Sequence, residues 1–368
     1  MPVRVLINAL HARSGGGVTY LRNLLPRLGA DPDLEVHLCL HENQAAAFPE
    51  PAKGVRLHSV RFRDGFVRRL IWEQTALPLL ARRIGAEVTF SPANFGPLLA
   101  PAPVVLLRNA VAVGESERRL SKCLYWITLG AMTRVSLLRC RRAVAVSEYA
   151  RDALTRRLPP RVAGRVEVIH HGVDPLFSPP PPGQEREDFV LAVSDLYIQK
   201  NLHRLLDALA ILRPEFPRIR LRIAGGAPDA EYARDLRRTV AERELGDHVR
   251  FLGHVAVPAL ADLYRRCALF VFPSLVETFG NPLAEAMASG APIVSSDTAA
   301  MPEVLGEAAL FFDPRDTGAM AERIAAALGD ADLRRRLGAR ALDRAAHFSW
   351  DETARRTARV ILSCAVTA

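Results

Sequence analysis

Cysteine is scarce in this chain and never clustered. Five cysteines lie among 368 residues, with no C-x-x-C spacing and no histidine nearby at metal-ligand spacing. A disulfide framework and a structural zinc site are therefore both disfavoured, because each needs closely placed partners. We expect the thiols to be buried in a protein of a reducing compartment; they are Cys39, Cys123, Cys140, Cys267 and Cys364.

Long apolar runs are also absent. No stretch reaches the roughly 18 consecutive apolar residues of a membrane-spanning helix. The opening residues MPVRVLINAL enter a strand pattern without a charged leader or a small-residue cleavage site, so we expect no secretion and a cytoplasmic location. With 49% hydrophobic and 24% charged residues, the composition is that of a globular protein long enough for two domains.

The charge balance is the one unusual bulk property. A formal net charge of +9 permits anionic partners such as nucleic acid, a phosphorylated substrate or an anionic membrane. A GC-rich genome that spreads arginine over solvated surfaces explains the charge equally well. No nucleic-acid reading motif accompanies it, so we expect no nucleic-acid partner.

Short apolar runs alternate with helical patterns along almost the whole chain. This alternation predicts an α/β fold with doubly wound parallel sheets covered by helices on both faces. The strand candidates are VRVLINAL, EVHLCL, VRLHSV, AEVTF, PVVLLRN and RAVAVS before residue 150, then DFVLAVSDL, RIRLRIAGG, VRFLGHV and ALFVFPS. Helices are expected over 18–28, 202–212 and 230–244, and in a short segment ending near Arg266.

The alternation breaks at GVDPLFSPPPPGQERED, where four consecutive prolines can neither continue a helix nor donate to a sheet. Ser349 and Glu352 have capping-box spacing and begin a terminal helix, which we expect to pack back on the N-terminal domain. Two such domains joined by a hinge imply a cleft with ligands at the carboxyl ends of the strands. The predicted parts are an N-terminal domain over 1–171, a linker over 172–188, a C-terminal domain over 189–346 and the terminal helix over 347–368.

The densest local signal lies in residues 273–297. A buried strand ends at Pro273 and a short loop follows. Asn281 is a favoured N-cap and Pro282 suits the first helical position, while Gly290 would end the helix in a left-handed conformation. The start of this helix offers backbone amides and a partial positive charge, which together make a seat for phosphate.

Two glutamates flank the start of that helix. Glu277 lies in the preceding loop and Glu285 about one turn inside the helix. A pair with this spacing arises by chance in a chain of this length, and a capped surface helix with one solvated glutamate is the alternative explanation. The strand, loop, cap and glycine stop around the pair favour an anion-binding role.

The segment resembles the donor-site signature of the retaining glycosyltransferases of family 4, which have the GT-B fold. That signature is E-x7-E within S-x-x-E-x-F-G-x-P-x-x-E-A-M-A-x-G-x-P-V-V-x-S. Similar stretches follow the family's order over nearly the whole chain, among them GGG, VSEYAR, IHHGVDP, SDLYIQKNL, AGG, FLGHV and MPEVLGEAALFFDP. The resemblance implies two Rossmann-like domains facing a deep cleft, the first binding the acceptor and the second the nucleotide sugar.

The resemblance also implies residue roles. Lys200 and Glu277 are the expected catalytic residues, with Lys200 against the donor diphosphate and Glu277 holding the transferred sugar. Glu285 would accept hydrogen bonds from the ribose hydroxyls, as an ionised carboxylate can. The other expected donor-binding residues are Gly15, Gly16, Gly17, Ser194, Gly225, Gly253, Phe279, Gly280, Asn281, Pro282 and Leu283.

The implied activity is transfer of a sugar from a nucleotide-diphosphate sugar to a saccharide or lipid-linked saccharide, with retention of configuration, in cell-surface polysaccharide or glycolipid synthesis. Because lysine and helix amides would neutralise the phosphates, we expect no metal ligands and no cofactor besides the donor substrate. The alternative is a catalytically silent protein that binds nucleotide sugars with the same fold.

Two positions depart from the family pattern. Ser194 and Asp195 stand where the family has its phosphate-binding arginine, and a carboxylate there would repel a diphosphate. Either Asp195 turns away, another arginine supplies the charge, or Lys200 acts alone. Arg108 and Asn109 stand where the family often has His-Asp, so they are the acceptor-side candidates although neither is an obvious base.

Residues 118–142 carry seven basic and no acidic side chains. An apolar stripe at helical spacing either packs in the core, which we slightly favour, or forms a basic amphipathic anchor for an anionic membrane. The segment FRDGFVRRLIW over 62–72 adds a second basic and aromatic patch, which would place the protein peripherally on the inner face of the membrane. The stripe comprises Leu120, Leu124, Ile127, Ala131, Val135 and Leu138.

Overall fold

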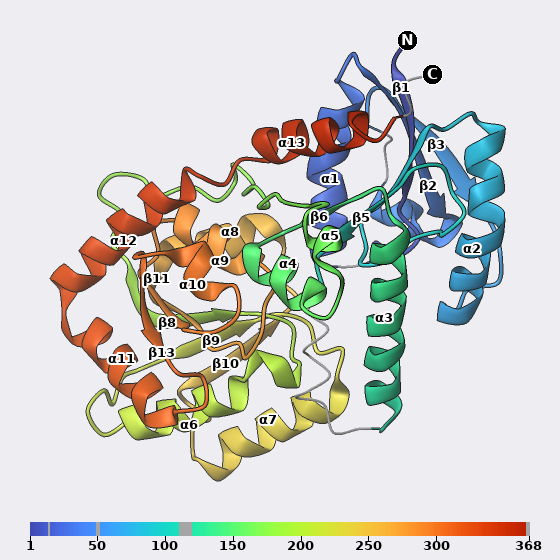
Figure 1. The fold of residues 1–368 in the computed structure, drawn as a ribbon. Helices are drawn as coiled ribbons and strands as arrows, with labels where there is room; N and C mark the ends of the chain where they lie inside the picture. The colour runs from blue at the N-terminus through green and yellow to red at the C-terminus, as the bar shows by residue number, and fades with distance from the viewer. Residues whose placement is uncertain (14, 49–51, 110–119, 366–368) are drawn as a thin grey trace. The chain divides into compact units, whose positions relative to one another are not determined.

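The computed structural model describes residues 1–13, 15–48, 52–109 and 120–365, with the backbone alone for 120–125. These residues form two compact units, each built on one sheet (Figure 1). Unit 1 runs to Gly172 and resumes at Ser349, and unit 2 runs from Val173 to Phe348.

Unit 1 contains a seven-stranded parallel sheet in the order β3-β2-β1-β4-β5-β6-β7. The direction of winding reverses between β1 and β4. Its strands are β1 (Val3–Asn8), β2 (Leu34–His41), β3 (Val55–Val60), β4 (Val88–Ser91), β5 (Pro103–Leu107), β6 (Arg142–Ala145) and β7 (Val166–Val168). Its helices are α1 (Gly16–Gly29), η1 (Glu42–Ala47), α2 (Phe66–Arg83), α3 (Leu120–Arg139), α4 (Glu148–Thr155), α5 (Pro160–Ala163) and α13 (Trp350–Leu362).

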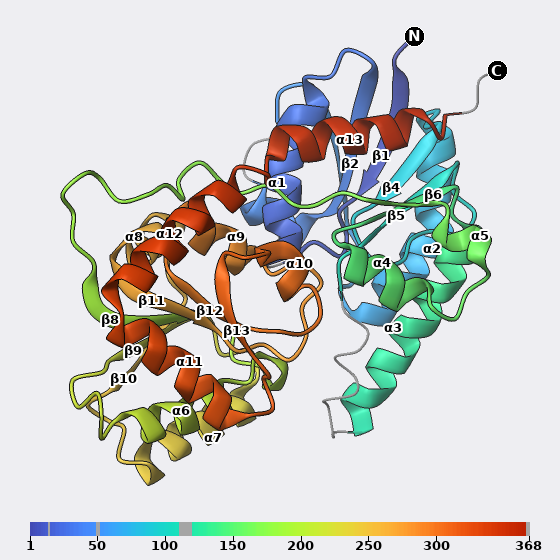
Figure 2. The same ribbon diagram turned by 60° about the vertical axis from the view of Figure 1, so that its left-hand side comes forward.

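Unit 2 repeats this plan with six parallel strands in the order β10-β9-β8-β11-β12-β13, and its winding reverses between β8 and β11. In Figures 1 and 2, α6 and α7 lie on one face of this sheet and α8 and α9 on the other. Its strands are β8 (Glu187–Val193), β9 (Leu221–Ala224), β10 (Val249–Gly253), β11 (Cys267–Phe272), β12 (Ile293–Ser296) and β13 (Ala309–Phe312). Its helices are η3 (Ile198–Lys200), α6 (Leu202–Leu212), α7 (Ala230–Glu242), α8 (Val257–Arg266), α9 (Asn281–Ala288), α10 (Met301–Leu305), α11 (Thr317–Gly329) and α12 (Ala331–Ala345).

The two sheets confirm the predicted doubly wound α/β fold. Every residue of β11 is buried, as expected for a strand covered on both faces and read from the sequence as one apolar run. The predicted boundaries shift slightly. β8 already begins at Glu187, inside the predicted linker, and α7 ends at Glu242 because Glu244 adopts a positive φ of 53°.

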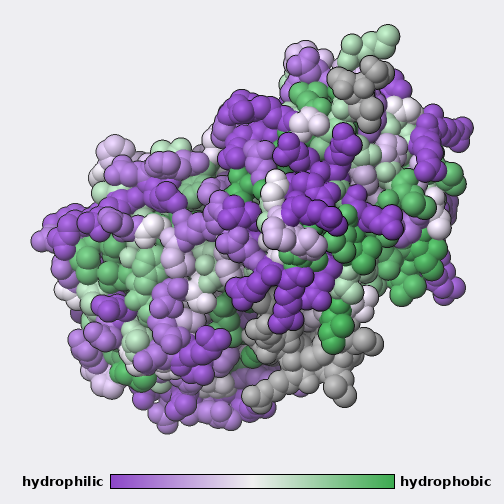
Figure 3. Space-filling view, in the orientation of Figure 1, coloured by the Kyte–Doolittle hydropathy of each residue, from purple (hydrophilic) through white to green (hydrophobic). Residues whose placement is uncertain are grey.

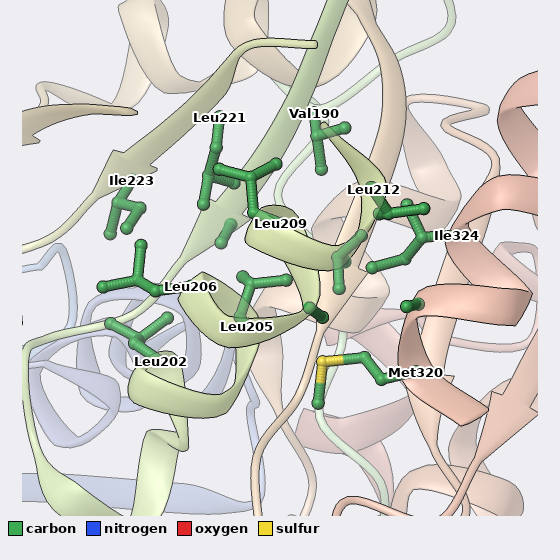
Figure 4. Packing of buried hydrophobic residues seen from close by; sticks show 14 of the residues in the cluster. Val190, Leu202, Leu205, Leu206, Leu209, Leu212, Leu221, Ile223, Met320 and Ile324 are labelled. Carbon is green, nitrogen blue, oxygen red and sulfur yellow. The ribbon is translucent and has the colours of Figure 1, made fainter. Parts of the chain in front are cut away.

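The core of unit 2 lies between its sheet and α6. Leucines recur along α6 at helical spacing and are almost fully buried (Figure 4). Met320 and Ile324 of α11 close the cluster on the helix side, and Leu221 and Ile223 of β9 contribute from the sheet. Burying leucines in this way is the main stabilising contribution to such a unit, at about 2 kcal/mol for each fully buried side chain.

Arg186 shows that the predicted linker has a structural role. Its guanidinium donates to the carbonyl oxygens of Tyr264, Arg265 and Cys267, and to those of Ser289 and Gly290. These carbonyls end α8 and α9, where a cation is favourable because the last carbonyls have no helical partner.

The terminal helix α13 belongs to unit 1 and lies beside α1 (Figure 2). Ser349 caps it by accepting hydrogen bonds from the amides of Asp351 and Glu352. Arg27 of α1 pairs with Asp351 at 2.5 Å, and Arg356 pairs with Glu167 of β7 at 2.9 Å.

The preferred expectation that the apolar stripe of α3 packs in the core is wrong for the described side chains. Ile127, Ala131, Val135 and Leu138 are exposed, whereas Leu120 and Leu124 lie outside the described side chains. The buried face of α3 is instead Leu129, Thr133, Ser136 and Leu137. The sequence pattern did not show this face because hydroxyl side chains interrupt its apolar residues. The hydroxyl of Thr133 can be buried because it donates to the carbonyl of Leu129.

Two further expectations concern the burial of the cysteine thiols and the length of apolar helices. Cys39, Cys140, Cys267 and Cys364 are buried free thiols, and the side chain of Cys123 lies outside the described part. Within that part, no helix combines the length and the apolar character that crossing a bilayer would demand.

Candidate functional site

In unit 2 the candidate donor residues gather where the winding reverses. Lys200 ends η3, the short 3-10 helix after β8, and Glu277 lies in the loop after β11. The amide of Leu275 donates to the carbonyl of Gln199 at 2.8 Å, which joins these two loops. In doubly wound sheets this reversal is where ligands bind.

Lys200 and Glu277 form an ion pair across the two loops. Nζ of Lys200 donates to Oε1 of Glu277, and Oγ of Ser274 donates to the same oxygen at 3.3 Å. The two charged side chains are 19% and 16% exposed, so both can still be reached from solvent. An ammonium with one carboxylate partner can exchange it for a phosphate oxygen, which accepts an equally strong charged hydrogen bond.

Asn201 fixes the backbone next to Lys200, and the sequence interpretation gave it no separate role. It adopts a left-handed conformation with φ of 58°, and its fully buried Nδ2 donates to the carbonyls of Pro273 at 3.0 Å and Pro314 at 2.8 Å. These two carbonyls follow β11 and β13. Asn201 therefore connects the segment of Lys200 to two other strand ends. The available signal in the sequence was the Lys-Asn pair that it forms with Lys200.

Glu285 lies in the second turn of α9 and is paired with Tyr264 of α8. The hydroxyl of Tyr264 donates to Oε2 of Glu285 at 3.0 Å. Burial nevertheless raises the pKa of the Glu285 carboxyl to about 7. The expectation of a fully ionised carboxylate thus holds only in part near neutral pH, and ligand hydroxyls that donate to Glu285 would favour the ionised form.

The start of α9 differs by one residue from the prediction. Gly280, with φ of 82°, is the N-cap, so Asn281 is the first helical residue and Pro282 the second. The predicted cap by the Asn281 side chain is wrong, because no side chain caps this helix. The amide of Leu283 donates to the carbonyl of Gly280 at 2.8 Å and proline has no amide hydrogen. The expected phosphate-binding amides are thereby reduced to at most those of Gly280 and Asn281.

Two predicted donor residues turn their side chains into the core. Phe279 is 2% exposed and packs edge-on against Phe348, with ring centroids 5.5 Å apart. Leu283 is fully buried. Only the backbones of these residues remain for ligand contact.

Asp195 has a partner that the sequence did not reveal. Its Oδ1 accepts a hydrogen bond from the amide of Gly226 at 2.8 Å, in the turn after β9. Gly225 in this turn has φ of 153°, and a Cβ there would lie 1.9 Å from the carbonyl oxygen of Ser194. The amide of Gly225 in turn donates to the carbonyl of Gly253 at 2.8 Å. The backbones of Ser194, Gly225 and Gly253 therefore lie close together at the ends of β8, β9 and β10.

In unit 1, one of the three glycines at the start of α1, Gly17, lies next to Arg108. Gly15 is the N-cap with φ of 56°, and α1 starts at Gly16. A Cβ on Gly17 would lie 2.6 Å from Nη2 of Arg108, so glycine lets that guanidinium rest on the first turn of the helix. Nε of Arg108 donates to the carbonyl of Pro92 at 2.9 Å.

Both acceptor-side candidates are held by Asn94, which the sequence did not single out. Oδ1 of this fully buried asparagine accepts from the amides of Arg108 and Asn109, each at 2.9 Å. Its Nδ2 donates to the carbonyl of Asn109 at 2.8 Å. Arg108 and Asn109 therefore occupy a fixed position at the carboxyl end of β5.

His11 and Glu73 lie at the same edge and were also missed. Nε2 of His11 is 3.2 Å from Oε2 of Glu73, whose side chain has no exposed surface. A signal was present: Glu73 shares the buried face of α2 with Leu77 and Ala81, so a carboxyl falls at an i, i+4, i+8 apolar position. A buried acid without an obvious partner in the sequence calls for a structural explanation.

Comparisons with known proteins agree with this architecture. Residues 14–176 match the family description "Glycosyltransferase Family 4", and residues 177–344 match "Glycosyl transferases group 1". The chain belongs to the glycosyltransferases of the GT-B fold that carry a family 4 domain.

Curated relatives match about half of the chain. O-antigen chain mannosyltransferase B of Escherichia coli is 34% identical over 175 residues, which are 46% of this chain and 45% of that protein. O-antigen chain mannosyltransferase RfbU of Salmonella typhimurium is 31% identical over 185 residues, 50% of each chain. The match thus spans about half the length of these relatives.

Solved structures share the fold over nearly the full chain. Sucrose-phosphate synthase from Thermosynechococcus elongatus has a TM-score of 0.80 at 20% identity, covering 98% of both chains. Anabaena HepE in complex with UDP-glucose has a TM-score of 0.78 at 17% identity, covering 98% of this chain and 99% of that one. WaaG, a glycosyltransferase involved in lipopolysaccharide biosynthesis, has a TM-score of 0.77 at 14% identity, with 97% and 99% covered.

Proposed function

We propose that this chain transfers a hexosyl group from a nucleotide-diphosphate sugar to an acceptor hydroxyl, in the synthesis of a cell-surface polysaccharide such as O-antigen. The observation that carries the proposal is the accessible Lys200–Glu277 pair beside the Gly280 cap, at the ligand position of unit 2. The names of the two O-antigen relatives make mannose the donor sugar to test first, and the HepE complex makes a nucleotide-sugar donor a sound choice.

Each residue has a role that its surroundings support. Lys200 leaves Glu277 for the diphosphate and neutralises the charge that grows as the sugar departs. Glu277 is then available to the hydroxyls of the transferred sugar. Glu285, beside Tyr264, accepts the ribose hydroxyls.

The proposed reaction retains the anomeric configuration and uses neither a metal nor a further cofactor. Lys200 and the backbone amides at the start of α9 take the part that a divalent ion would otherwise have at a diphosphate. Proton NMR of the first-formed product checks the stereochemistry, and an inverted linkage would contradict retention. Added EDTA is expected to leave the transfer rate unchanged.

Donor turnover without acceptor tests the activity itself. Uridine, guanosine and adenosine diphosphate sugars are incubated with the chain, and slow hydrolysis of one of them is expected. The same assay on Lys200→Ala should show almost none. Tight binding of a nucleoside diphosphate with hydrolysis of no donor would point instead to a silent binding protein.

The proposed acceptor is a lipid-linked saccharide, reached at the inner face of an anionic membrane. Ile127 and Val135 on α3 are 69% and 44% exposed, and Arg134 and Arg139 on the same helix are exposed. Val67 and Ile71 of α2 form a second exposed apolar pair next to Arg68. Green hydrophobic surface lies among purple polar side chains on the right-hand side of Figure 3. Exposed apolar groups with neighbouring arginines suit an anionic lipid surface.

Co-sedimentation with vesicles checks this surface. The chain should bind vesicles that contain phosphatidylglycerol, and an Ile127→Ser, Val135→Ser variant should bind them several-fold less. Leu342→Ser on α12 of unit 2 is the matched control, because Leu342 is also partly exposed. Equal binding by both variants would rule out α3 as the anchor.

A further inference from the structure

His11 occupies a rigid turn directly after β1. The turn is closed by a hydrogen bond from the amide of Ala12 to the carbonyl of Ala9 at 2.9 Å. Nε2 of Gln44 donates to these same two residues, to the carbonyl oxygens of Ala9 and Ala12, each at 2.8 Å. Gln44 is itself buried and accepts from the amide of His41 at 2.9 Å. Such a support holds a side chain in one position before any ligand arrives.

The ring of His11 is held on two sides. Phe95 contacts it edge-on, with ring centroids 4.7 Å apart. Oε2 of Glu73 lies 3.2 Å from Nε2. The other oxygen of Glu73 accepts a hydrogen bond from Nδ2 of Asn8, which is 3.3 Å from Oγ of Ser91. The carboxyl group is therefore fixed by partners from β1 and from the turn that follows it.

This geometry sets the tautomer of His11. A carboxylate oxygen accepts hydrogen bonds, so Nε2 carries the hydrogen and Nδ1 presents a lone pair. Within the described residues, Nδ1 of His11 accepts no hydrogen bond. The side chain is 13% exposed, which leaves it open to a ligand, whereas Glu73 at 0% can act only through His11.

The location is the ligand position of unit 1. His11 follows β1 and Asn94 follows β4, the two strands between which the winding reverses. Asn94 holds Arg108 and Asn109 at the end of the next strand, β5. The edge thus combines a lone-pair nitrogen with hydrogen-bonding side chains of the kind that bind sugar hydroxyls.

We propose that His11 is the residue that binds and deprotonates the acceptor hydroxyl, and that Glu73 is the positioning residue behind it. This inference rests on the proposed glycosyl transfer. The bond from the sugar's anomeric carbon to the diphosphate oxygen breaks, and its electron pair stays with the diphosphate. The acceptor oxygen forms the new bond to that carbon, and its proton moves to Nδ1 of His11. The resulting imidazolium is paired with the Glu73 carboxylate and passes the proton to water after product release.

His11→Gln is the first test. The glutamine amide can still donate to Glu73, but the lone pair of Nδ1 is gone. With a saccharide acceptor, transfer should fall about 100- to 10,000-fold, the usual contribution of a general base. Donor hydrolysis without acceptor and the melting temperature should stay near those of the unchanged chain. His347→Gln, at an exposed histidine of unit 2, is the matched control and should transfer normally.

Glu73→Gln separates positioning from mere packing. The amide of the new side chain donates to Nε2, so the hydrogen moves to Nδ1 and the lone pair is lost although the imidazole remains. Transfer should fall as in His11→Gln while donor hydrolysis persists in the folded variant. Unchanged transfer in folded His11→Gln, or equal loss of transfer and donor hydrolysis, would overturn the assignment. If the unchanged chain neither transfers nor hydrolyses any donor, the proposed function fails, and this inference fails with it.

Discussion

The two units place a similar pair of side chains at the same point of a similar sheet. In each, a basic side chain follows the first strand and contacts a glutamate: His11 with Glu73 in unit 1, and Lys200 with Glu277 in unit 2. The glutamates differ in access, since Glu73 has no exposed surface and Glu277 is 16% exposed. Glu277 can therefore touch a ligand directly, whereas Glu73 can only orient its histidine.

The origin of each glutamate explains this difference. Glu277 comes from a loop at the carboxyl edge of the sheet, where side chains face ligands. Glu73 comes from the buried face of α2, where packing surrounds it. One topology thus supports a pair suited to anion binding and a pair suited to proton transfer.

Lys200→Ala should have the broadest effect, because it should reduce donor hydrolysis as well as transfer, and it tests the difference between the two units most directly. Because Lys200 contacts the leaving diphosphate under the proposed function, transfer and donor hydrolysis should both fall about 100- to 1000-fold. His11→Gln is expected to affect transfer alone. Steady-state rates with and without acceptor measure the contrast, with Arg213→Ala on the surface of unit 2 as control. Near-normal donor hydrolysis in Lys200→Ala would refute the donor site.

Glu285→Gln should lose activity and gain stability. The folded-state pKa of about 7 lies above the ordinary 4.5, so the ionised carboxyl destabilises the fold increasingly as pH rises between these two values. Above pH 7 the variant should be more stable by up to about 3 kcal/mol, with no gain below pH 4.5. Loss of the ribose hydrogen bonds should weaken donor binding about 10- to 100-fold.

Chemical denaturation at a series of pH values measures the stability of Glu285→Gln, and nucleotide titration measures its binding. Glu322→Gln, on the exposed face of α11, should change neither. A stability difference independent of pH would show that the carboxyl is not the source of the gain.

Asn201→Ala should disturb the Lys200 site without touching a ligand. Two buried hydrogen bonds are lost and alanine disfavours φ of 58°, so the free energy of unfolding should fall by about 3 kcal/mol. Donor affinity should fall with it. Asn201→Gly tolerates the backbone angle and should lose less stability. Equal losses in both variants would assign the whole effect to the hydrogen bonds.

Asp195→Ala should have the smallest effect. Its carboxylate is engaged by the amide of Gly226, so its removal should cost about 1 kcal/mol of stability. Donor hydrolysis should stay unchanged or rise, since one negative charge near the diphosphate is removed. A large fall in hydrolysis would mean that the Gly226 turn itself contacts the donor.

Local pattern was a good guide to elements and a weaker guide to their surroundings. The period of the apolar residues located α6 and ten of the thirteen strands in the described part of the chain but missed β7, β12 and β13. The segment around residue 281 gave the start of α9 to within one residue. The local pattern misjudged the cap, because the N-cap is Gly280, which has a positive φ that glycine adopts readily, and Asn281 is already the first helical residue. It also misjudged α3, because an apolar period does not say which side of a helix meets the sheet.

The sequence alone determined the alternation of strands and helices, the parallel doubly wound sheets, and the identity of Lys200, Glu277 and Glu285 as candidates. The alternation and the sheets follow from periodicity, and Glu277 and Glu285 from a local motif, both of which act between residues close along the chain. Lys200 was implied by the resemblance to family 4. Tertiary structure decided the pairing of His11 with Glu73, the partner of Asp195, and the raised pKa of Glu285. Such properties depend on burial and on contacts between distant segments, and these exist only once the sheets have brought their strand ends together.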